Sequence, residues 1–368
     1  MDKEIRKLEQ RLEKLGEALI DQKKARVIIE SYRREKGFWF GGGKLIRDKQ
    51  SRLILSGRYR NAGDSRYGLE AGERGLELAV FVSRDQGLSF QKILSWGKKD
   101  LANGGKEVIS IEGSCLYLAK DRVWLFVSLE KKLGYPASVK EYQKPGTGIW
   151  EVDVFSGETI EKLNAAEIRT VLSSLRPERL HIKDPVVFDL NKQTYMFYCQ
   201  HPFSWTCSYT GLARLRNNME VQEIVSEDVL PRGYCWDVAV CRLTCRVPVP
   251  RVGFLRELPP VSLYFYDGAE CMREHPQSEK GIVRPRGFSC EEISGLAWGF
   301  DEKFPEIYRL SLHFPFFVSD QGTGCSRYIS ATGSEDGLFA CWQKSMADFS
   351  QPLVFHTLNR KEIEEILK

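Results

Sequence analysis

Carboxylates at the start of apolar, aromatic-rich segments are the residues in this chain best suited to acid–base chemistry. Glu112 opens the segment EGSCLYLAKDRVWLFVSLEK, and Asp184 lies at the start of KDPVVFDLNKQTYMFYCQHP. A third carboxylate, Asp64, lies in a charged, glycine-rich stretch from Arg58 to Glu77. Two carboxyl groups about 5 to 10 Å apart can cleave a glycosidic bond, and crowding can raise the pKa of one of them enough to keep it protonated. These three residues are therefore the candidates for catalysis.

Cationic and aromatic residues along the chain are candidates for binding a substrate. Arginines and lysines can hold an anion or a hydroxyl group, and an indole ring can stack on the apolar face of a sugar. The alternative for the arginines is a structural network with nearby acidic residues, which adds little stability per pair. The alternative for Trp205 is packing under its own loop. The substrate-binding candidates are Arg58, Arg60, Arg66, Glu73, Lys183, His201, Trp205, Asp237, Glu292 and Arg327.

A helix is expected near each end of the chain. Apolar residues spaced by three and four from Ile5 to Leu19 predict a helix from residue 3 to about residue 34. The apolar stripe predicts packing on the outside of the main domain, and a short coiled-coil contact that forms a homodimer is the alternative. Asn359 followed by Glu362 has the capping-box pattern, which predicts a short helix over residues 359–368.

Between the two helices, pairs of strands recur. An apolar strand, a short polar turn and an aromatic-rich strand follow one another five times, first in GGKLIRDKQSRLILSGRYR and last from Ser294. A further strand or hairpin follows each pair, so each unit has four strands. This recurrence predicts an all-β fold, a five-bladed β-propeller. A β-sandwich would not explain why units open with a carboxylate.

The units divide the chain into three parts. An N-terminal helix is expected in residues 1–36, the propeller in residues 37–358 and the C-terminal helix in residues 359–368. A helical insert is predicted at residues 165–175, and the fourth unit is predicted to open at Trp236, immediately before Asp237.

The openings of the second and third units resemble those of a known group of propellers. EGSCLY followed by VWLFVS resembles the blade that carries the acid glutamate in five-bladed propeller glycosidases of the arabinanase, xylosidase and invertase type. KDPVVF followed by TYMFYCQHP is similar to their Asp-Pro blade opening. The resemblance implies that residues starting the innermost strands point into an axial funnel that binds a sugar. The first unit departs from the family, because FWFGGGKLIRD has no aspartate at the place of the usual base, and Asp64 is the nearest substitute.

A second resemblance concerns a turn. Ser83, Asp85, Gly87 and Phe90 match the Asp-box of sialidase-like propellers, which lies at the periphery of a blade. The resemblance implies a structural role, because an aspartate can cap the amides of a turn and glycine readily adopts a positive φ.

These features predict a glycoside hydrolase-like enzyme. Glu112 is predicted to be the general acid and Asp64 the base or nucleophile, with Asp184 tuning the pKa and holding sugar hydroxyls. The arginines favour a small acidic or phosphorylated glycoside as substrate. The alternatives are a glycoside phosphorylase, in which phosphate replaces the attacking water, and a non-catalytic propeller that binds a glycan or a protein.

Composition argues against several other classes. A net charge of +4 over 368 residues is too small for the basic stripe of a nucleic-acid-binding protein, and no apolar run is long enough to span a membrane. The charged N-terminus lacks the apolar region of a signal peptide, so we expect a cytoplasmic protein. The ten cysteines form no CxxC pair. With no Ca²⁺-loop or nucleotide-binding motif either, the sequence predicts no metal and no cofactor.

Overall fold

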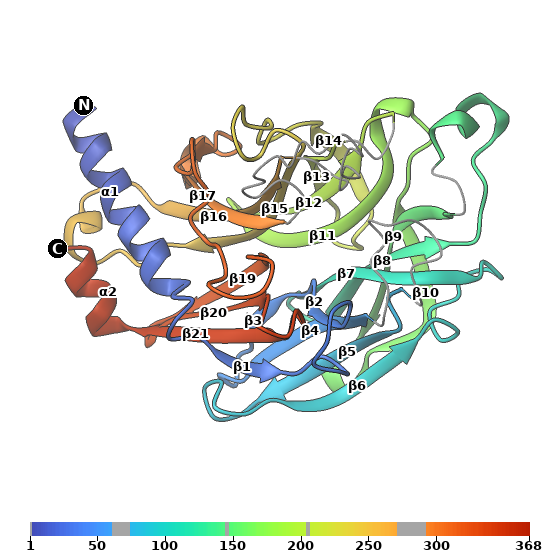
Figure 1. Ribbon diagram of the computed structural model, residues 1–368, viewed down its shortest axis with the longest axis horizontal. Helices are drawn as coiled ribbons and strands as arrows, with labels where there is room; N and C mark the ends of the chain where they lie inside the picture. The colour runs from blue at the N-terminus through green and yellow to red at the C-terminus, as the bar shows by residue number, and fades with distance from the viewer. Residues whose placement is uncertain (1, 61–73, 144–146, 204–206, 271–291) are drawn as a thin grey trace, which may run out of the picture.

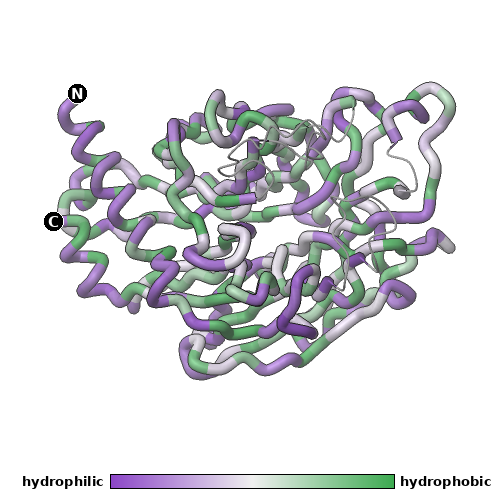
Figure 2. Tube along the Cα trace, in the orientation of Figure 1, coloured by the Kyte–Doolittle hydropathy of each residue, from purple (hydrophilic) through white to green (hydrophobic). Residues whose placement is uncertain are grey.

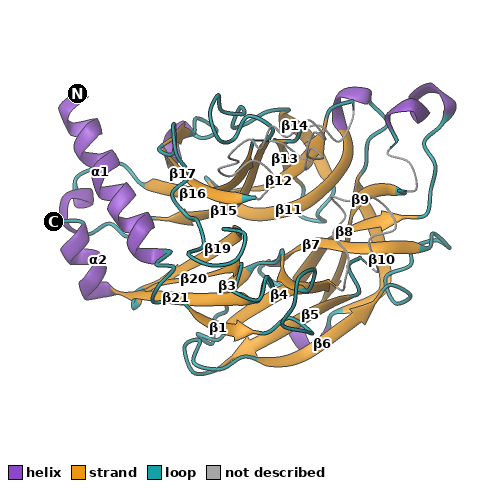
Figure 3. Ribbon diagram, in the orientation of Figure 1, coloured by secondary structure: helices purple, strands orange, loops and turns teal. Residues whose placement is uncertain are grey.

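The computed structural model describes residues 2–60, 74–143, 147–203, 207–270 and 292–368 (Figure 1). In this part of the chain β-strands dominate, as the sequence predicts. The helices α1 (Asp2–Leu19) and α2 (Arg360–Ile366) lie side by side at one end of the molecule (Figure 3). No helix of the described residues is long and apolar enough to cross a membrane.

Most strands pair antiparallel with their neighbours along the chain. One sheet contains β7 (Val108–Leu118), β8 (Val123–Lys131), β9 (Ile149–Gly157) and β10 (Asn164–Leu172). A second contains β11 (Leu180–Leu190), β12 (Gln193–His201), β13 (Tyr209–Leu215) and β14 (Val221–Ser226). A third contains β2 (Trp39–Gly41), β4 (Leu53–Arg60), β5 (Glu77–Ser83) and β6 (Gln91–Gly97), with β3 (Leu45–Arg47) also paired to β4. The polar turns predicted inside the first three hairpins are confirmed.

The largest sheet has two halves. One half contains β15 (Val240–Pro248), β16 (Val261–Ala269), β17 (Ile293–Phe300) and β18 (Tyr308–Arg309). The other contains β19 (Ser326–Ser334), β20 (Gly337–Lys344), β21 (Leu353–Asn359) and β1 (Arg26–Ile29). The halves meet where Ile293 pairs in parallel with Ser326. The outer strand β1 comes from the N-terminal region and pairs antiparallel with β21.

Five strands, β3, β7, β11, β15 and β19, form a closed ring. Each is linked to the next by a polar contact that joins two sheets or two halves of a sheet. In order around the ring, the contacts are Ser114 N to Gly42 O (2.7 Å), Val187 N to Cys115 Sγ (3.2 Å), Arg242 Nη1 to Asp184 Oδ2 (3.0 Å), Ala331 N to Cys245 Sγ (3.1 Å) and Leu45 N to Ser330 Oγ (2.9 Å). The five strands therefore surround one axis, and their side chains determine what the axis can bind.

Two predicted helical segments are wrong in extent or type. Residues 165–175 are not a helical insert, because β10 occupies Asn164–Leu172 and pairs with β9. The β-branched residues of this segment and the open edge of β9 outweigh its helical propensity. The first helix ends at Leu19 instead of near residue 34, and the RVII segment pairs with β21 as β1. The N-terminal part thus contributes a strand to the last sheet as well as a helix.

The predicted start of the fifth unit is also wrong. The strand from Ser294 is β17, which pairs antiparallel with β16 along its whole length and belongs with β15. The last group of strands starts at β19 instead. The long segment between β16 and β17 interrupts the regular hairpin spacing of the sequence, so the spacing predicts this unit boundary one strand pair too early.

The apolar stripe of α1 packs within the chain, which confirms the first of the two alternatives for this helix. Leu8, Leu12, Leu15 and Leu19 are at most 1% exposed and share a core with residues of β17, β20 and β21. Most of the other residues of α1 are hydrophilic (Figure 2). Gly16 permits the close approach of the sheet, because a Cβ atom there would lie 2.5 Å from Leu296 Cδ2. The leucines of the stripe are covered by the chain itself, and a homodimer through the N-terminal helix stays a prediction.

The segment that resembles an Asp-box is a turn between β5 and β6. Asp85 Oδ1 accepts hydrogen bonds from Ser83 Oγ (2.7 Å) and from Ser89 N (2.9 Å), and Gly87 has a φ of 91°. The Ser89 hydroxyl, which donates to Asp85 Oδ2, and then these two bonds lower the pKa of Asp85 to about 2. The turn lies at the end of β5 and β6, away from the ring of five strands, in agreement with a structural role.

Replacing Leu12 by alanine should remove a buried side chain from the contact between α1 and the sheets. Leu→Ala substitutions in a core cost about 2 to 5 kcal/mol, so we expect the free energy of unfolding in urea to fall by about that amount. The matched control is Gln10→Ala on the exposed side of the same helix, for which the change should stay within about 0.5 kcal/mol. Equal effects of the two substitutions would show that α1 does not depend on this contact.

Candidate active site

Irregular backbone marks the first half of three ring strands. The pairing register shifts between Ile111 and Ser114 in β7, between Lys183 and Val186 in β11, and near Tyr328 in β19. Asp184 and Tyr328 have φ values of 54° and 53°. Bulges and left-handed residues of this kind redirect side chains and occur often beside functional sites. Here they accompany side chains that converge at one end of the axis.

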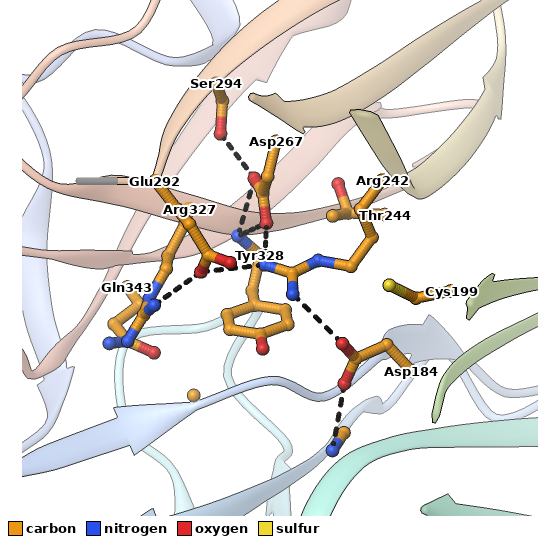
Figure 4. A network of polar contacts seen from close by, with 12 residues as sticks. Asp184, Cys199, Arg242, Thr244, Asp267, Glu292, Ser294, Arg327, Tyr328 and Gln343 are labelled. Carbon is orange, nitrogen blue, oxygen red and sulfur yellow. Dashed lines mark hydrogen bonds and ion pairs between the residues drawn. The ribbon is translucent and has the colours of Figure 1, made fainter. Parts of the chain in front are cut away.

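Arg242 of β15 lies at the centre of this convergence (Figure 4). Its Nη1 atom lies 3.0 Å from Asp184 Oδ2, and its Nη2 atom lies 2.8 Å from Asp267 Oδ2 and 2.9 Å from Glu292 Oε2. The side chain of Arg242 is 3% exposed. One buried guanidinium therefore neutralises carboxylates from β11, from β16 and from the residue before β17. We call the group formed by Arg58, Glu112, Asp184, Arg242, Asp267, Glu292, Arg327 and Tyr328 the axial cluster.

The ring of Tyr328 packs against three guanidinium groups. The ring centroid lies 4.2 Å from Arg242 Cζ, 5.2 Å from Arg58 Cζ and 5.4 Å from Arg327 Cζ. The backbone N–H of Tyr328 donates to both oxygens of Asp267 at 3.1 Å. Cations over an aromatic face are attracted by its quadrupole. Tyr328 therefore fixes the spacing of three cations that would otherwise repel one another.

Glu112 of β7 is held as a carboxylate. Ser110 Oγ donates to its Oε1 at 2.7 Å, and Arg58 Nη2 lies 3.4 Å from its Oε2. Burial alone would raise the pKa of Glu112, but Arg58, Arg60 and Lys183 outweigh burial and lower the pKa to about 2. This is the opposite of what the predicted general acid needs at neutral pH. Neighbouring carboxylates would raise the pKa of Glu112, as the sequence predicts, but the cations that lie among these carboxylates have the larger effect.

Glu292 and Arg327 form the edge of the cluster. Arg327 Nη1 donates to Glu292 Oε2, the same oxygen that Arg242 contacts. Burial opposes ionisation of Glu292, and Arg242, Arg327 and Lys183 lower its pKa well below the usual range despite it. Trp39 lies between two cations, with Arg327 Cζ 4.4 Å and Arg60 Cζ 4.6 Å from its ring centroid. The edge thus combines an aromatic ring with charged groups.

Most described members of the predicted site lie in or beside the axial cluster. Arg58, Glu112, Asp184, Glu292 and Arg327 belong to it, while Arg60 and Lys183 border it and act on the charge of Glu112. His201 is buried, and burial and then Lys183 lower its pKa well below the usual range, so its ring is neutral. A ring nitrogen of His201 lies 2.9 Å from the Cys207 carbonyl oxygen. Asp64, Arg66, Glu73 and Trp205 lie outside the described residues.

Asp237 does not join the axial cluster. It is fully buried, and its Oδ2 lies 2.9 Å from Arg309 Nε and 3.1 Å from the Tyr266 hydroxyl. The prediction placed it at the opening of the fourth unit, but β15 starts at Val240 and its residue in the cluster is Arg242. Asp237 is therefore part of a separate structural pair.

Sequence reasoning missed Arg242, Asp267, Tyr328 and Trp39. The other units have a carboxylate near the start of the first strand, whereas in the fourth unit the corresponding residue is an arginine. Asp267 lies on β16, the second strand of its unit, where no site residue is expected. Tyr328 lies on β19, which the sequence does not predict as the start of a unit. The alternation of polar Arg242 with apolar Cys241 and Leu243 in the first strand of this unit is the signal that could have found Arg242.

A second buried charge group lies on β8 and β9. Lys131 Nζ lies 2.8 Å from Glu151 Oε2 and 2.7 Å from Asp153 Oδ2. Glu130 lies 2.8 Å from Arg74 Nη2 and accepts a bond from Gly148 N, and its burial raises its pKa. The described residues contain no group of three or more histidine, cysteine or acidic side chains arranged to hold a metal ion.

Comparisons with known proteins match this chain by its fold. Neither the models of known protein families nor the curated proteins give a match to the sequence. A solved glycoside hydrolase matches with a TM-score of 0.59 at 12% identity, over 94% of each chain. The GH43_1 enzyme from Xanthomonas citri, complexed with xylotriose, matches at 0.52 and 10% identity, over 95% of this chain and 93% of the other. A β-1,2-mannobiose phosphorylase from Listeria innocua matches at 0.54 and 13% identity, over 92% and 96%.

The chain has the fold of these carbohydrate-active enzymes. The resemblance to propeller glycosidases that the unit openings indicated is thereby confirmed at the level of the fold. At 10 to 13% identity the likeness establishes the architecture and leaves the reaction to be argued from the site.

Replacing Arg242 by methionine should leave the buried carboxylates of Asp184 and Asp267, and the partly buried one of Glu292, without their shared cation. Removing one partner of a buried ion pair costs about 3 to 5 kcal/mol, so we expect the free energy of unfolding at pH 7 to fall by about that amount. The control is Arg34→Met, because Arg34 is 72% exposed and pairs with Glu30 at the surface, where a pair contributes about 0 to 1 kcal/mol. An Arg242→Met protein as stable as wild type would contradict this account.

The ionised state of Glu112 predicts how stability responds to acid. Its folded-state pKa of about 2 is below the ordinary value of 4.5, so its contribution is present above pH 4.5 and is lost as the pH falls toward 2. The contribution is about 3 kcal/mol at neutral pH. Urea titrations of wild type and Glu112→Gln between pH 7 and pH 2 should therefore converge at the acid end. A constant difference between the two curves would mean that this carboxylate is not held ionised by its neighbours.

Proposed function

We propose that this chain is a five-bladed β-propeller enzyme that cleaves a glycosidic bond at the axial cluster. The blade count is supported by the closed ring of five strands, each followed by its own antiparallel partners. The single observation that carries the activity is the convergence of Glu112, Asp184, Asp267 and Glu292 at one end of that ring, with cations and two aromatic rings between them. A structural core has no need of so many buried charges, because apolar residues of similar volume are as stable or more so.

The environment of Glu112 suggests its part in the reaction. A carboxylate that stays ionised at neutral pH can act as a base toward water or as a nucleophile, so we assign Glu112 this role in place of the general acid. Asp184 accepts a hydrogen bond from Gly113 N at 3.2 Å and pairs with Arg242, and it would position hydroxyl groups. For Asp64 we propose the second carboxyl group of the pair, with the role of general acid.

The cations favour a substrate that carries negative charge. Arg58, Arg60, Lys183 and Arg327 surround or border Glu112 and Glu292, and guanidinium groups bind carboxylate and phosphate well. A small acidic or phosphorylated glycoside is therefore the proposed substrate class, handled in the cytoplasm. The buried ring of Trp39 packs against Arg60 and Arg327 and would hold these two cations in place at the edge of the site.

The same cations favour a glycoside phosphorylase as the second candidate. In that reaction inorganic phosphate replaces the attacking water, so the enzyme needs an anion site beside the scissile bond. The fold shared with a β-1,2-mannobiose phosphorylase is compatible with this chemistry. The two candidates differ in one observable, the dependence of turnover on phosphate. A propeller that binds a glycan or a protein without cleaving it is the remaining alternative.

Replacing Glu112 by glutamine retains the shape of the side chain and should strongly reduce the rate of the reaction. The assay is release of product from a panel of aryl glycosides and of acidic and phosphorylated oligosaccharides, with and without inorganic phosphate. A general base contributes about 100-fold to 10,000-fold, so kcat should fall by at least about 100-fold. The control is Glu107→Gln, because Glu107 is 65% exposed and pairs with Lys132 at the surface.

The panel separates the proposed functions. Turnover without phosphate supports hydrolysis, and turnover only in its presence supports phosphorolysis. No turnover by wild type on any member, or equal turnover by Glu112→Gln and wild type, would refute the proposed role of the axial cluster.

A further inference from the structure

A cavity lies at the opposite end of the axis from the axial cluster. It has a volume of about 660 Å³ and is lined by the second halves of all five ring strands, including Ile46, Leu116, Phe188, Val247 and Thr332. Phe188 lies four residues beyond Asp184 on β11, which corresponds to roughly 13 Å along a strand. Between the two ends, beside Gly43, Ser114 and Val186, lies only a small pocket with a volume of about 20 Å³. The cavity is therefore separate from the proposed site of cleavage.

The size and walls of this cavity suit a small organic molecule. Ligand sites typically measure about 300 to 1,000 Å³ and combine apolar walls with a few polar groups. Here the walls include Leu116, Val187, Phe188, Val247 and Val252. The charged residues of the lining are five cationic side chains and two acidic ones: Lys44, Arg47, Arg246, Arg251, Arg360, Asp189 and Glu335. Positive charge therefore predominates.

Lys44 is the unusual member of this lining. Its side chain projects from the segment just before β3, and the residue is 8% exposed. Its backbone N–H is bonded to Ser56 Oγ, but the ammonium group has no hydrogen-bond or ion-pair partner among the described residues. The ammonium is not among the buried polar atoms that lack a partner, so it faces the open space of the cavity while the rest of the side chain is covered. A cation in this position can form a charge-assisted hydrogen bond with an anion that enters the cavity.

The other deeply buried lysines of the described chain show how this protein normally treats such a charge. Lys131 is fully buried and contacts both Glu151 and Asp153 at 2.8 Å or less. Lys344 is 5% exposed and lies 2.8 Å from Asp320 Oδ1. Each has a carboxylate within contact distance, and Lys44 has none among the described residues. The contrast indicates that the partner of Lys44 comes from outside the chain.

Neighbouring cations in the cavity already have partners. Arg47 Nη2 lies 3.1 Å from Asp336 Oδ2, and Arg246 Nη2 lies 2.9 Å from Asp301 Oδ2. Asp189 accepts hydrogen bonds from Tyr117 and Thr194, each at 2.8 Å, so its carboxylate already has two partners. The paired arginines would hold the edge of the cavity. Arg251 is exposed and, among the described residues, donates only to carbonyl oxygens, so Lys44 is the buried residue whose charge is left for a ligand.

We propose that this cavity is a second ligand site, which binds a small molecule with one anionic head and an apolar body. The head group, a phosphate or a carboxylate, pairs with the Lys44 ammonium, and the body lies against the apolar walls formed by β7, β11 and β15. The site is independent of the reaction at the other end of the axis and does not depend on the proposed function.

Calorimetric titration tests this site with probes of the stated chemistry. Phenyl phosphate, benzoate and inorganic phosphate are titrated into wild type, Lys44→Met and the surface control Lys132→Met, whose parent lysine is 66% exposed. We expect saturable binding of phenyl phosphate or benzoate by wild type and by the control, and the tighter of the two identifies the head group. Loss of one charge-assisted bond should weaken binding by roughly 10-fold to 100-fold in Lys44→Met. Weaker binding of inorganic phosphate than of phenyl phosphate would confirm the contribution of the apolar walls.

A measurement on the wild-type protein keeps the proposal testable if Lys44→Met fails to fold. Reductive methylation followed by mass spectrometry reports the accessibility of each amine. The probe that binds should slow the labelling of Lys44 and leave that of Lys132 unchanged. Absence of saturable binding of both organic probes up to 10 mM, equal binding by Lys44→Met and wild type, or unprotected Lys44 at saturation would each overturn the proposal.

Discussion

The guanidinium of Arg242 is the interaction on which the centre of this molecule depends. It contacts carboxylates from β11, from β16 and from the residue before β17, and it packs on the ring of Tyr328 from β19. Because a buried charge is tolerated only when its partners are in place, these elements must meet in one arrangement. A core of leucine and valine alone would tolerate small shifts between neighbouring sheets. The planar guanidinium of Arg242 does not, because its N–H groups point in fixed directions and each must meet its carboxylate.

Charge balance in the axial cluster also determines what the site can do before any substrate arrives. Arg58 and Lys183 keep Glu112 ionised, and Arg327 and Arg242 do the same for Glu292. The hydrogen bonds of Asp267 to the Tyr328 amide and to Ser294 orient its carboxylate as well. Groups held in this way need little rearrangement when charge develops nearby, which is the basis of electrostatic preorganisation. The strained φ angles of Asp184 and Tyr328 are compatible with the same purpose.

Local patterns in the sequence predict the β-rich fold and part of the site. Apolar segments and polar turns predict the hairpins of the first three units, and Glu112 and Asp184 are recognisable because each lies near the start of a ring strand. The partners that give these residues their properties could not be predicted, because Arg58, Arg242 and Tyr328 reach them across different sheets. In the fourth unit the residue that points into the cluster from the ring strand is Arg242 instead of a carboxylate, so the pattern of acidic residues does not identify it.

The errors in secondary structure have a similar origin. Residues 165–172 have helical propensity, yet the free edge of β9 recruits them as β10, and residues 26–29 join β21 at the far end of the chain. In both places pairing with another strand outweighs the local preference. The partner of β10 is the strand that directly precedes it, whereas the partner of β1 lies at the other end of the chain, outside any window of sequence around residues 26–29.

The pairing of β1 with β21 has a consequence for biosynthesis. Arg26 lies opposite Phe355 in the register, so β1, the first strand to be synthesised, cannot pair until β21, the last strand, has been made. At about 5 to 20 residues per second the interval is roughly 20 to 60 s. During this time the apolar face of α1 also lacks β17, β20 and β21, the strands that cover it in the finished protein. The nascent chain therefore carries an uncovered amphipathic helix for most of its synthesis, and a binding factor that shields this helix would protect the chain until the ring closes.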